Sequence, residues 1–261
     1  MSRIYPICSS SSGNSTFIGT RGHGIIVDAG CSFRALKNAL SLIGTKLDES
    51  EVEAVFITHE HTDHIKGVEQ LVKQTKIPIF ASSGTLKAMF PSGTDARIFD
   101  AEEGYHSADI EVSAFRTSHD SAMSVGYKIR FGEDYFGICT DTGIVTAEAE
   151  KALLGCKTVL LESNYDEEML RKNLNYPPDL KRRISGEFGH LSNTACAEFA
   201  LRLVKSGTRN LILGHLSPEN NTPNTAKCFV EKYLFTHGFA VERDYTLSVA
   251  PVATAGEYIA I

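Results

Sequence analysis

The segment His59-Glu60-His61-Thr62-Asp63-His64 holds three imidazoles and one carboxylate within six residues. It follows the apolar run Ala54-Val55-Phe56-Ile57, which is typical of a buried strand, and precedes a helical pattern over residues 65–73. Imidazole nitrogens and carboxylate oxygens suit zinc and similar divalent ions. Side chains two apart in an extended turn project to one side, so His59 and His61 could share one ion. Asp63 and His64 are then left for another.

Three more potential ligands follow β-runs further along the chain. His119 comes after a run that ends at Phe115, Asp141 follows a hairpin strand, and His215 follows the apolar residues 211–213. Loops at strand ends commonly build functional sites, so we expect these side chains to join the cluster. For His119 the alternative is an ordinary loop position, with the third ligand elsewhere.

The composition is that of a globular protein. The 261 residues are 42% hydrophobic and 22% charged, close to the average of folded domains. No apolar run approaches the roughly 20 residues that a membrane span requires, and the N-terminus lacks the apolar region of a signal peptide. The six cysteines form no C-x-x-C pair. We therefore expect one soluble domain over residues 1–261, in the cytoplasm, with reduced thiols.

The pattern of elements favours an α/β (α+β) fold. Short β-runs open the chain, and later apolar strands alternate with helical patterns over residues 146–154, 193–205 and 223–235. A helix is also expected over residues 32–43, with Ser32 as its N-cap and Gly44 beyond its end. Strand-rich halves, each followed by helices, predict two sheets packed face to face with helices outside, which makes four layers.

The order Asp28, then His59-x-His61-x-Asp63-His64, then His119, Asp141 and His215 resembles the metallo-β-lactamase superfamily over nearly the whole chain. The resemblance implies an αββα sandwich with a metal site at one edge between the sheets. It also implies two divalent ions, zinc or manganese with iron possible, whose ligands are His59, His61 and His119 for one, Asp63, His64 and His215 for the other, and Asp141 as the bridge. Asp28 would support the ligands from behind; its alternative is a helix N-terminal carboxylate near Ser32.

Four further segments resemble the YycJ (WalJ) subfamily. They are Cys8-Ser9-Ser10-Ser11-Ser12-Gly13-Asn14-Ser15, Glu162-Ser163-Asn164, Gly189-His190-Leu191-Ser192-Asn193, and Gly214-His215-Leu216-Ser217-Pro218-Glu219-Asn220-Asn221. That subfamily usually has a histidine after the Glu-Ser-Asn triplet, where this chain has Tyr165. The resemblance implies a cytoplasmic phosphodiesterase with DNA exonuclease activity.

The mechanism that follows is metal-assisted phosphodiester hydrolysis. A hydroxide bridging the two ions would be the nucleophile, and Asp63 would be both a ligand and a proton acceptor. His190 would donate a proton or hydrogen bond to a phosphate oxygen or leaving group, or else be a core or capping histidine. The alternative activities are thioester or lactone hydrolysis on the same fold, and a non-catalytic, metal-bound regulatory protein.

Two features leave alternatives open. The serine tract of residues 8–15 is either a flexible turn in which Gly13 adopts positive φ, or a lining for the substrate phosphate. The net charge of −6 disfavours binding nucleic acid by bulk charge, although two divalent cations would offset part of it. Five cations against one acid, Asp179, give residues 171–183 a local charge of +4: Arg171, Lys172, Lys181, Arg182 and Arg183. This is either a solvated helix face or an approach for a DNA backbone. His23, His106 and His237 are expected to be structural.

Overall fold

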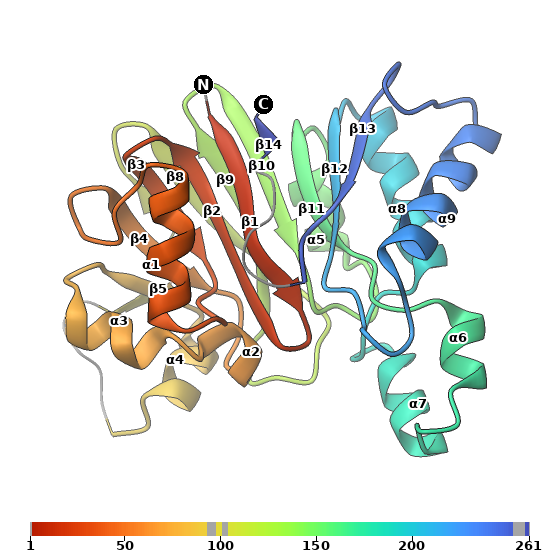
Figure 1. Ribbon diagram of the computed structural model, residues 1–261, viewed down its shortest axis with the longest axis horizontal. Helices are drawn as coiled ribbons and strands as arrows, with labels where there is room; N and C mark the ends of the chain where they lie inside the picture. Colours follow the sequence, from red (N-terminus) through yellow and green to blue (C-terminus); the bar gives the residue numbers. More distant parts are fainter. Residues whose placement is uncertain (1, 93–97, 101–103, 253–258, 261) are drawn as a thin grey trace.

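The computed structural model describes residues 2–92, 98–100, 104–252 and 259–260. These residues form two seven-stranded sheets that lie face to face (Figure 1). The first sheet has the order β14-β1-β2-β3-β4-β5-β6, with strands β1 (Arg3–Ser10), β2 (Gly13–Thr20), β3 (His23–Val27), β4 (Val52–Ile57), β5 (Ile79–Ala81), β6 (Ile98–Asp100) and β14 (Ile259–Ala260). The second has the order β13-β12-β11-β10-β9-β8-β7, with strands β7 (Tyr105–His106), β8 (Ile110–Arg116), β9 (Val125–Phe131), β10 (Asp134–Cys139), β11 (Thr158–Glu162), β12 (Asn210–Gly214) and β13 (Thr246–Val249).

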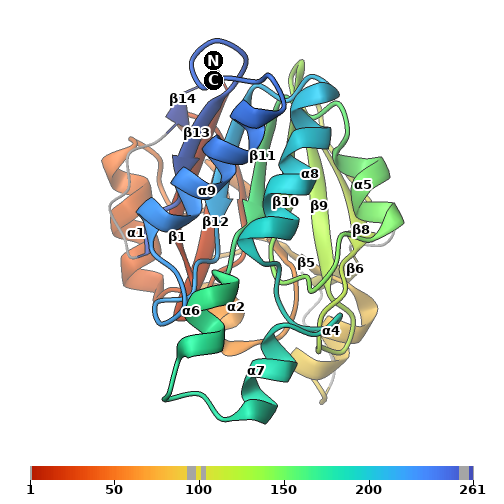
Figure 2. The ribbon, with the colours of Figure 1, turned by 90° about the vertical axis from the view of Figure 1, so that its right-hand side faces the viewer.

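Helices cover the outer face of each sheet. The first sheet is covered by α1 (Phe33–Leu42), α3 (Val68–Gln74) and α4 (Ser83–Met89), and the second by α5 (Ala147–Leu153), α8 (Asn193–Lys205) and α9 (Pro223–Thr236). The short helices α2 (Thr62–Ile65), α6 (Glu167–Lys172) and α7 (Pro178–Ile184) lie near the lower edge in Figures 1 and 2. The α/β four-layer sandwich expected from the sequence is confirmed.

Three apolar cores account for the four layers. The central core joins residues from both sheets, such as Phe56 and Tyr127, whose rings meet edge-on with centroids 5.5 Å apart. The outer cores lie between each sheet and its helices. Burial of apolar surface on both faces explains why strands such as β4 and β12 are almost wholly apolar.

Local signals define the first long helix as predicted. The Ser32 side chain accepts a hydrogen bond from the Ala35 N–H at the start of α1, and Gly44 follows the C-cap with a φ of 72°. The single helix expected over residues 65–73 is wrong, because α2 ends at Ile65 and α3 begins at Val68. The cause is Gly67. Its N–H donates to Ala29 O at 2.7 Å, and a Cβ on this residue would lie 2.5 Å from the Cys31 carbonyl oxygen, so no side chain fits there.

The topology gathers the chemically active loops at one edge. Strands β3, β4 and β5 are parallel in the first sheet, and β10, β11, β12 and β13 are parallel in the second. Their carboxyl ends therefore point the same way, and β8 joins them because it is antiparallel to β9, which is antiparallel to β10. The loops that follow β3, β4, β8, β10, β11 and β12 meet at this edge, near α2 in Figure 1.

Candidate metal centre

The structure brings all seven predicted ligands together. Their potential ligand atoms form overlapping groups within 4.8 Å of one another, namely His59, His61 and His119; Asp63, His64 and His215; His59, His64 and Asp141; and Asp141, Glu162, His190 and His215. Asp141 belongs to two groups and lies between the others. The ordinary-loop alternative for His119 is therefore not what the fold adopts.

Several ring nitrogens in this cluster are available to a cation. His119 Nδ1 donates to the Gly189 carbonyl at 3.0 Å, and His64 Nδ1 donates to Asp28 Oδ2 at 2.8 Å. These bonds leave Nε2 of each ring on the cluster side, where Asn14 Nδ2 lies 3.0 Å from His64 Nε2. Among the described residues, three buried atoms in the cluster have no hydrogen-bond partner: His59 Nε2, His215 Nε2 and Asp141 Oδ2. Buried, unpaired acceptors facing one another fit divalent cations with nitrogen and oxygen ligands.

Asp28 lies behind the ligands. It is 3% exposed and accepts hydrogen bonds from the Thr58 N–H at 2.8 Å and from the Thr58 hydroxyl and His64 Nδ1. Asp28 therefore orients His64 and the backbone at Thr58, directly before His59. The alternative, a carboxylate at the N-terminus of a helix, is wrong because Ser32 caps α1.

Backbone strain is concentrated in this centre. Of the four non-glycine residues with positive φ among those the structure describes, three are Asp28 at 61°, Asp141 at 54° and His215 at 53°. Such conformations cost free energy and persist only where the surroundings enforce them. At His215 the N–H donates to Ser9 Oγ at 2.8 Å, which ties the loop after β12 to the end of β1.

Charge in the cluster is balanced between imidazoles and carboxylates. Burial lowers the pKa of His64, but the Asp28 and Asp141 carboxylates outweigh it and raise that pKa well above its usual value. Burial likewise opposes the charge on His215, yet Asp141, Asp63 and Glu162 raise its pKa to about 10. Asp141 is buried as well, and His215 and His64 hold its pKa well below the usual range. The carboxylates thus make this buried site favourable for positive charge.

Glu162 is a member of the centre that sequence reasoning missed as a functional residue. Its side chain is fully buried, with Oε1 accepting from His190 Nδ1 at 2.8 Å and His215 Nδ1 at 2.9 Å. Oε2 accepts from the backbone N–H groups of Thr142, at 2.8 Å, and Leu191. The available signal was a carboxylate directly after a wholly apolar strand, as for Asp28. Glu162 fixes the orientation of two histidine rings at once.

His190 lies at the rim of the cluster. Its side chain is partly exposed, and its Nδ1 is held by Glu162 and lies 3.8 Å from Asp141 Oδ1. Burial lowers the pKa of His190, but the Glu162 carboxylate outweighs it and raises that pKa. Ser192 is the N-cap of α8, accepting from the Ala195 N–H, so His190 is not the capping residue.

The serine tract supports the ligand loops from behind. Ser9, Ser10, Asn14 and Ser15 are buried, and Asn14 Nδ2 donates to Ser10 O at 2.9 Å and to Asp63 Oδ2 at 3.2 Å. The tract forms the ends of β1 and β2 with a turn at Ser11 and Ser12 between them, and the positive φ expected for Gly13 is wrong. A glycine is needed there because a Cβ would lie 3.0 Å from Gly30 O.

Gly30 is the tightest backbone contact of the centre. A Cβ at this position would lie 1.6 Å from Asp63 O and 2.5 Å from Asn14 N. Gly30→Ala should lower the free energy of unfolding by about 1–3 kcal/mol or more, and weaken metal binding by displacing Asp63. Thermal denaturation and metal titration check this. Gly132→Ala adds a methyl in open space on the β9–β10 turn and should leave metal binding unchanged; equal metal affinity in both variants would contradict the prediction.

The basic segment is partly neutralised by ion pairs. Lys172 and Arg171 pair with Glu168, Arg182 pairs with Asp179, and Arg183 Nε lies 2.6 Å from Asp120 Oδ2. The count of +4 over residues 171–183 stands, and Glu168 and Asp120 from outside that range offset two of these charges, which leaves +2 for the segment with its partners. No residue of α7 is buried, and the Arg183–Asp120 pair holds this helix beside His119.

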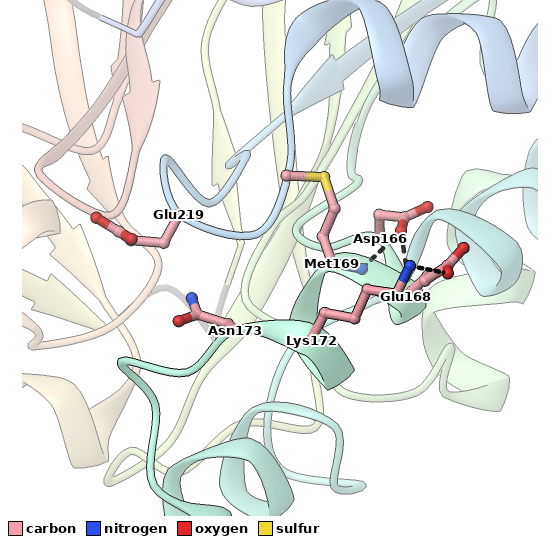
Figure 3. Close-up of a pocket in the computed structure, with 6 residues that line it drawn as sticks. All are labelled: Asp166, Glu168, Met169, Lys172, Asn173 and Glu219. Carbon is pink, nitrogen blue, oxygen red and sulfur yellow. Dashed lines mark hydrogen bonds and ion pairs between the residues drawn. The ribbon is translucent and has the colours of Figure 1, made fainter.

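An open depression of about 500 Å³ lies beside α6 (Figure 3). It is lined by α6 and by the loop after β12, through Asp166, Glu168, Met169, Lys172, Asn173 and Glu219. None of the clustered ligands lines it. Tyr165 occupies the position where the subfamily usually has histidine, and it is buried just before α6. Its carbonyl accepts a hydrogen bond from the Asn193 N–H at 2.9 Å. Burial raises the pKa of the Tyr165 phenol to about 12.

The histidines expected to be structural lie outside the metal-ligand groups of the described residues. His23 pairs with Glu53, and His237 Nδ1 donates to Tyr233 O at 2.8 Å. All six cysteines are unpaired. Among the helices that the structure describes, none has the length and apolar character needed to cross a bilayer.

Comparisons with known proteins agree with this geometry. Residues 23–216 match the family described as Beta-lactamase superfamily domain. The chain is 34% identical over 242 residues to the exodeoxyribonuclease YycJ of Bacillus anthracis, covering 90% of each chain. It is also 34% identical to the exodeoxyribonuclease WalJ of Streptococcus pneumoniae serotype 2 (strain D39), covering 84% of this chain and 83% of that one.

A solved structure shows the same fold. The metallo-beta-lactamase fold protein YhfI from Bacillus subtilis superimposes with a TM-score of 0.71 at 12% identity, over 99% of this chain and 98% of its own. The chain therefore belongs to the metallo-β-lactamase superfamily, as a YycJ/WalJ-like member.

Proposed function

We propose that this metal-dependent hydrolase is a dinuclear phosphodiesterase that degrades DNA from its ends. The observation that carries the proposal is the position of Asp141 between two groups of ligand atoms, His59, His61 and His119 on one side and Asp63, His64 and His215 on the other. Relatives named exodeoxyribonuclease, similar over most of the chain, support DNA as the substrate. The complete ligand set favours an enzyme over a non-catalytic regulator.

The grouping of the ligand atoms supports the ligand roles that the family resemblance implies. His59, His61 and His119 would hold one ion, Asp63, His64 and His215 the second, and Asp141 both. Two such ions would lower the pKa of a shared water and bind a phosphodiester oxygen. Zinc and manganese both suit this mixture of nitrogen and oxygen ligands, and iron remains compatible with it.

Asp63 is proposed to accept the proton released on attack. Its side chain is 22% exposed, whereas that of Asp141 is 3% exposed, so Asp63 is the one of these two carboxylates in contact with solvent. Asn14 Nδ2 holds Asp63 Oδ2 at 3.2 Å and keeps the side chain in place. A proton can therefore leave the buried centre through Asp63.

His190 is proposed to donate a proton or hydrogen bond to the leaving oxygen. Glu162 occupies its Nδ1, which leaves Nε2 as the ring atom free to meet substrate. His190→Ala should reduce kcat on a DNA end by about 10²-fold, with metal content unchanged. Steady-state kinetics with metal analysis check this, with His237→Ala as the control. Unchanged turnover would assign His190 a structural role.

The experiment that tests the function is a substrate panel. Protein loaded with zinc or manganese is assayed against end-labelled DNA, end-labelled RNA, bis-p-nitrophenyl phosphate and a glutathione thioester. We expect cleavage of the small diester and progressive shortening of DNA, both abolished by chelation. Activity on the thioester alone would overturn the nuclease proposal in favour of thioester hydrolysis.

The proposed location is the cytoplasm. The support is the six unpaired cysteines, four of which are buried, in a fold that packs three apolar cores without a disulfide.

A further inference from the structure

An aromatic side chain stands exposed two residues before His190. Phe188 is 63% exposed, although it lies in the segment between α7 and His190 that packs against the metal centre. Exposing such a ring costs free energy in proportion to the apolar area that remains in contact with water. Isolated exposed apolar side chains are common on proteins, so what surrounds Phe188 decides its meaning.

The backbone around Phe188 is held by the loop that carries His119. The Phe188 carbonyl accepts from the Asp120 N–H at 3.1 Å, and the preceding carbonyl, of Glu187, accepts from Ser118 Oγ at 2.7 Å. The following carbonyl, of Gly189, accepts from His119 Nδ1 at 3.0 Å. Three successive carbonyls are thus bound to three successive residues of one loop, and Phe188 is an exposed ring on a fixed backbone.

A second exposed apolar side chain lies on the neighbouring loop. Gly143, two residues after Asp141, packs so closely that a Cβ would lie 2.3 Å from the carbonyls of Gly186 and Glu187, and its N–H donates to Ser118 O at 2.8 Å. The next residue, Ile144, is 45% exposed. The loops that supply Asp141, His119 and His190 therefore carry Ile144 and Phe188 at their outer ends.

A guanidinium is held by the same loop. The Arg183 side chain is 63% exposed, and its Nε is bound to Asp120, the residue after His119, which offsets part of its charge. An exposed aromatic ring, an apolar neighbour and a guanidinium beside a phosphodiester-cleaving centre are the combination that binds single-stranded nucleic acid, with bases on the ring and backbone near the cation.

We propose that Phe188 is a stacking platform for a nucleobase of single-stranded DNA whose phosphodiester lies at the metal centre, with Ile144 as its apolar neighbour. This proposal rests on the proposed nuclease function. It adds that the protein contacts the flat face of a base, so binding tolerates any base sequence. It also requires that the bound DNA end is unpaired. Phe188 is thus a substrate-positioning residue that takes no part in proton transfer.

The kinetic test compares Phe188→Leu and Phe188→Trp with Phe235→Leu. Phe235 is an equally exposed phenylalanine on α9, in the outer helical layer. Phe188→Leu should raise KM for a single-stranded oligonucleotide about 5- to 100-fold, while Phe188→Trp and Phe235→Leu retain it. Cleavage of bis-p-nitrophenyl phosphate, which has no base, should be unchanged in all three. An oligonucleotide lacking bases at its end should bind wild type and Phe188→Leu equally.

A binding test separates this proposal from the nuclease function. A single-stranded oligonucleotide carrying 2-aminopurine near its end, with phosphorothioate linkages that resist cleavage, is titrated with metal-loaded full-length protein, so no cleavage is needed. Wild type should quench the fluorescence through stacking, and Phe188→Leu should quench it less and bind more weakly. Equal quenching and affinity in both proteins, or no binding by wild type, would overturn the stacking role. Failure of wild type to cleave any diester would instead overturn the nuclease function.

Discussion

Under the proposed function, Asp141→Asn should reduce phosphodiester cleavage by at least about 10²–10³-fold, because the ions that Asp141 would help hold would supply several kcal/mol of transition-state stabilisation. Asparagine keeps the size of the side chain but removes the buried charge that lies between the two ligand groups. The remaining imidazoles, His64 and His215, lose the carboxylate that balances them. The measurement is kcat on bis-p-nitrophenyl phosphate and DNA, with metal content determined by elemental analysis.

The matched control for this prediction is Asp179→Asn. Asp179 is an exposed carboxylate on α7 whose partner is Arg182, and it has no contact with the cluster. The control should keep wild-type metal content and turnover. An Asp141→Asn protein that still binds two equivalents of metal and retains full activity would refute the shared role of this carboxylate.

Glu162→Gln should lower metal affinity and turnover about 10- to 100-fold, the usual effect of losing a group that orients ligands. Both carboxylate oxygens of Glu162 accept hydrogen bonds, one from the His190 and His215 rings and the other from two backbone N–H groups. Glutamine has one acceptor and one donor at these positions. In either orientation the glutamine NH₂ group faces two hydrogen-bond donors. Two of the four hydrogen bonds of Glu162 are therefore lost at a fully buried position.

The measurement for Glu162 pairs metal titration with kinetics. Glu150→Gln is the control, because Glu150 is partly exposed on α5 and pairs with Arg202 away from the centre. Circular dichroism checks that both variants are folded. If the Glu162 variant is folded and matches wild type in both metal affinity and kcat, the orienting role is wrong.

Elements with strong local signals were predictable from the sequence. Helix α8 spans the predicted residues 193–205, and α1 has the predicted cap at Ser32, since caps and apolar periods are local properties. Helix α6 was not predicted, and α7 only as the solvated helix face considered for residues 171–183, because both helices bury almost nothing and so show no apolar period. The break at Gly67 depends on a contact with Ala29, which no local pattern reveals.

In the candidate site, too, the features with local sequence signals could be predicted and those that depend on distant contacts could not. The ligand types and their positions after strands could be read from the chain, because spacing and strand ends are visible there. The supporting contacts of Glu162 and Asn14 could not, because they join side chains 28 to 53 residues apart. The ion pair of Arg183 was missed for the same reason, because Asp120 lies 63 residues away. The pairs of Arg171 and Lys172 are local, at helical spacing from Glu168, and were missed because Glu168 lies just outside the basic segment.

The bond between Ser9 Oγ and the His215 N–H joins residues 206 positions apart in the chain. Proteins rich in such distant pairings fold slowly, and ribosomal synthesis delivers the N-terminal end first. The His59–His64 ligands therefore emerge long before His215 can complete their surroundings. A nascent chain that ends before β12 holds only part of this cluster, so under the proposed ligand roles full metal loading and activity would follow the synthesis of β12.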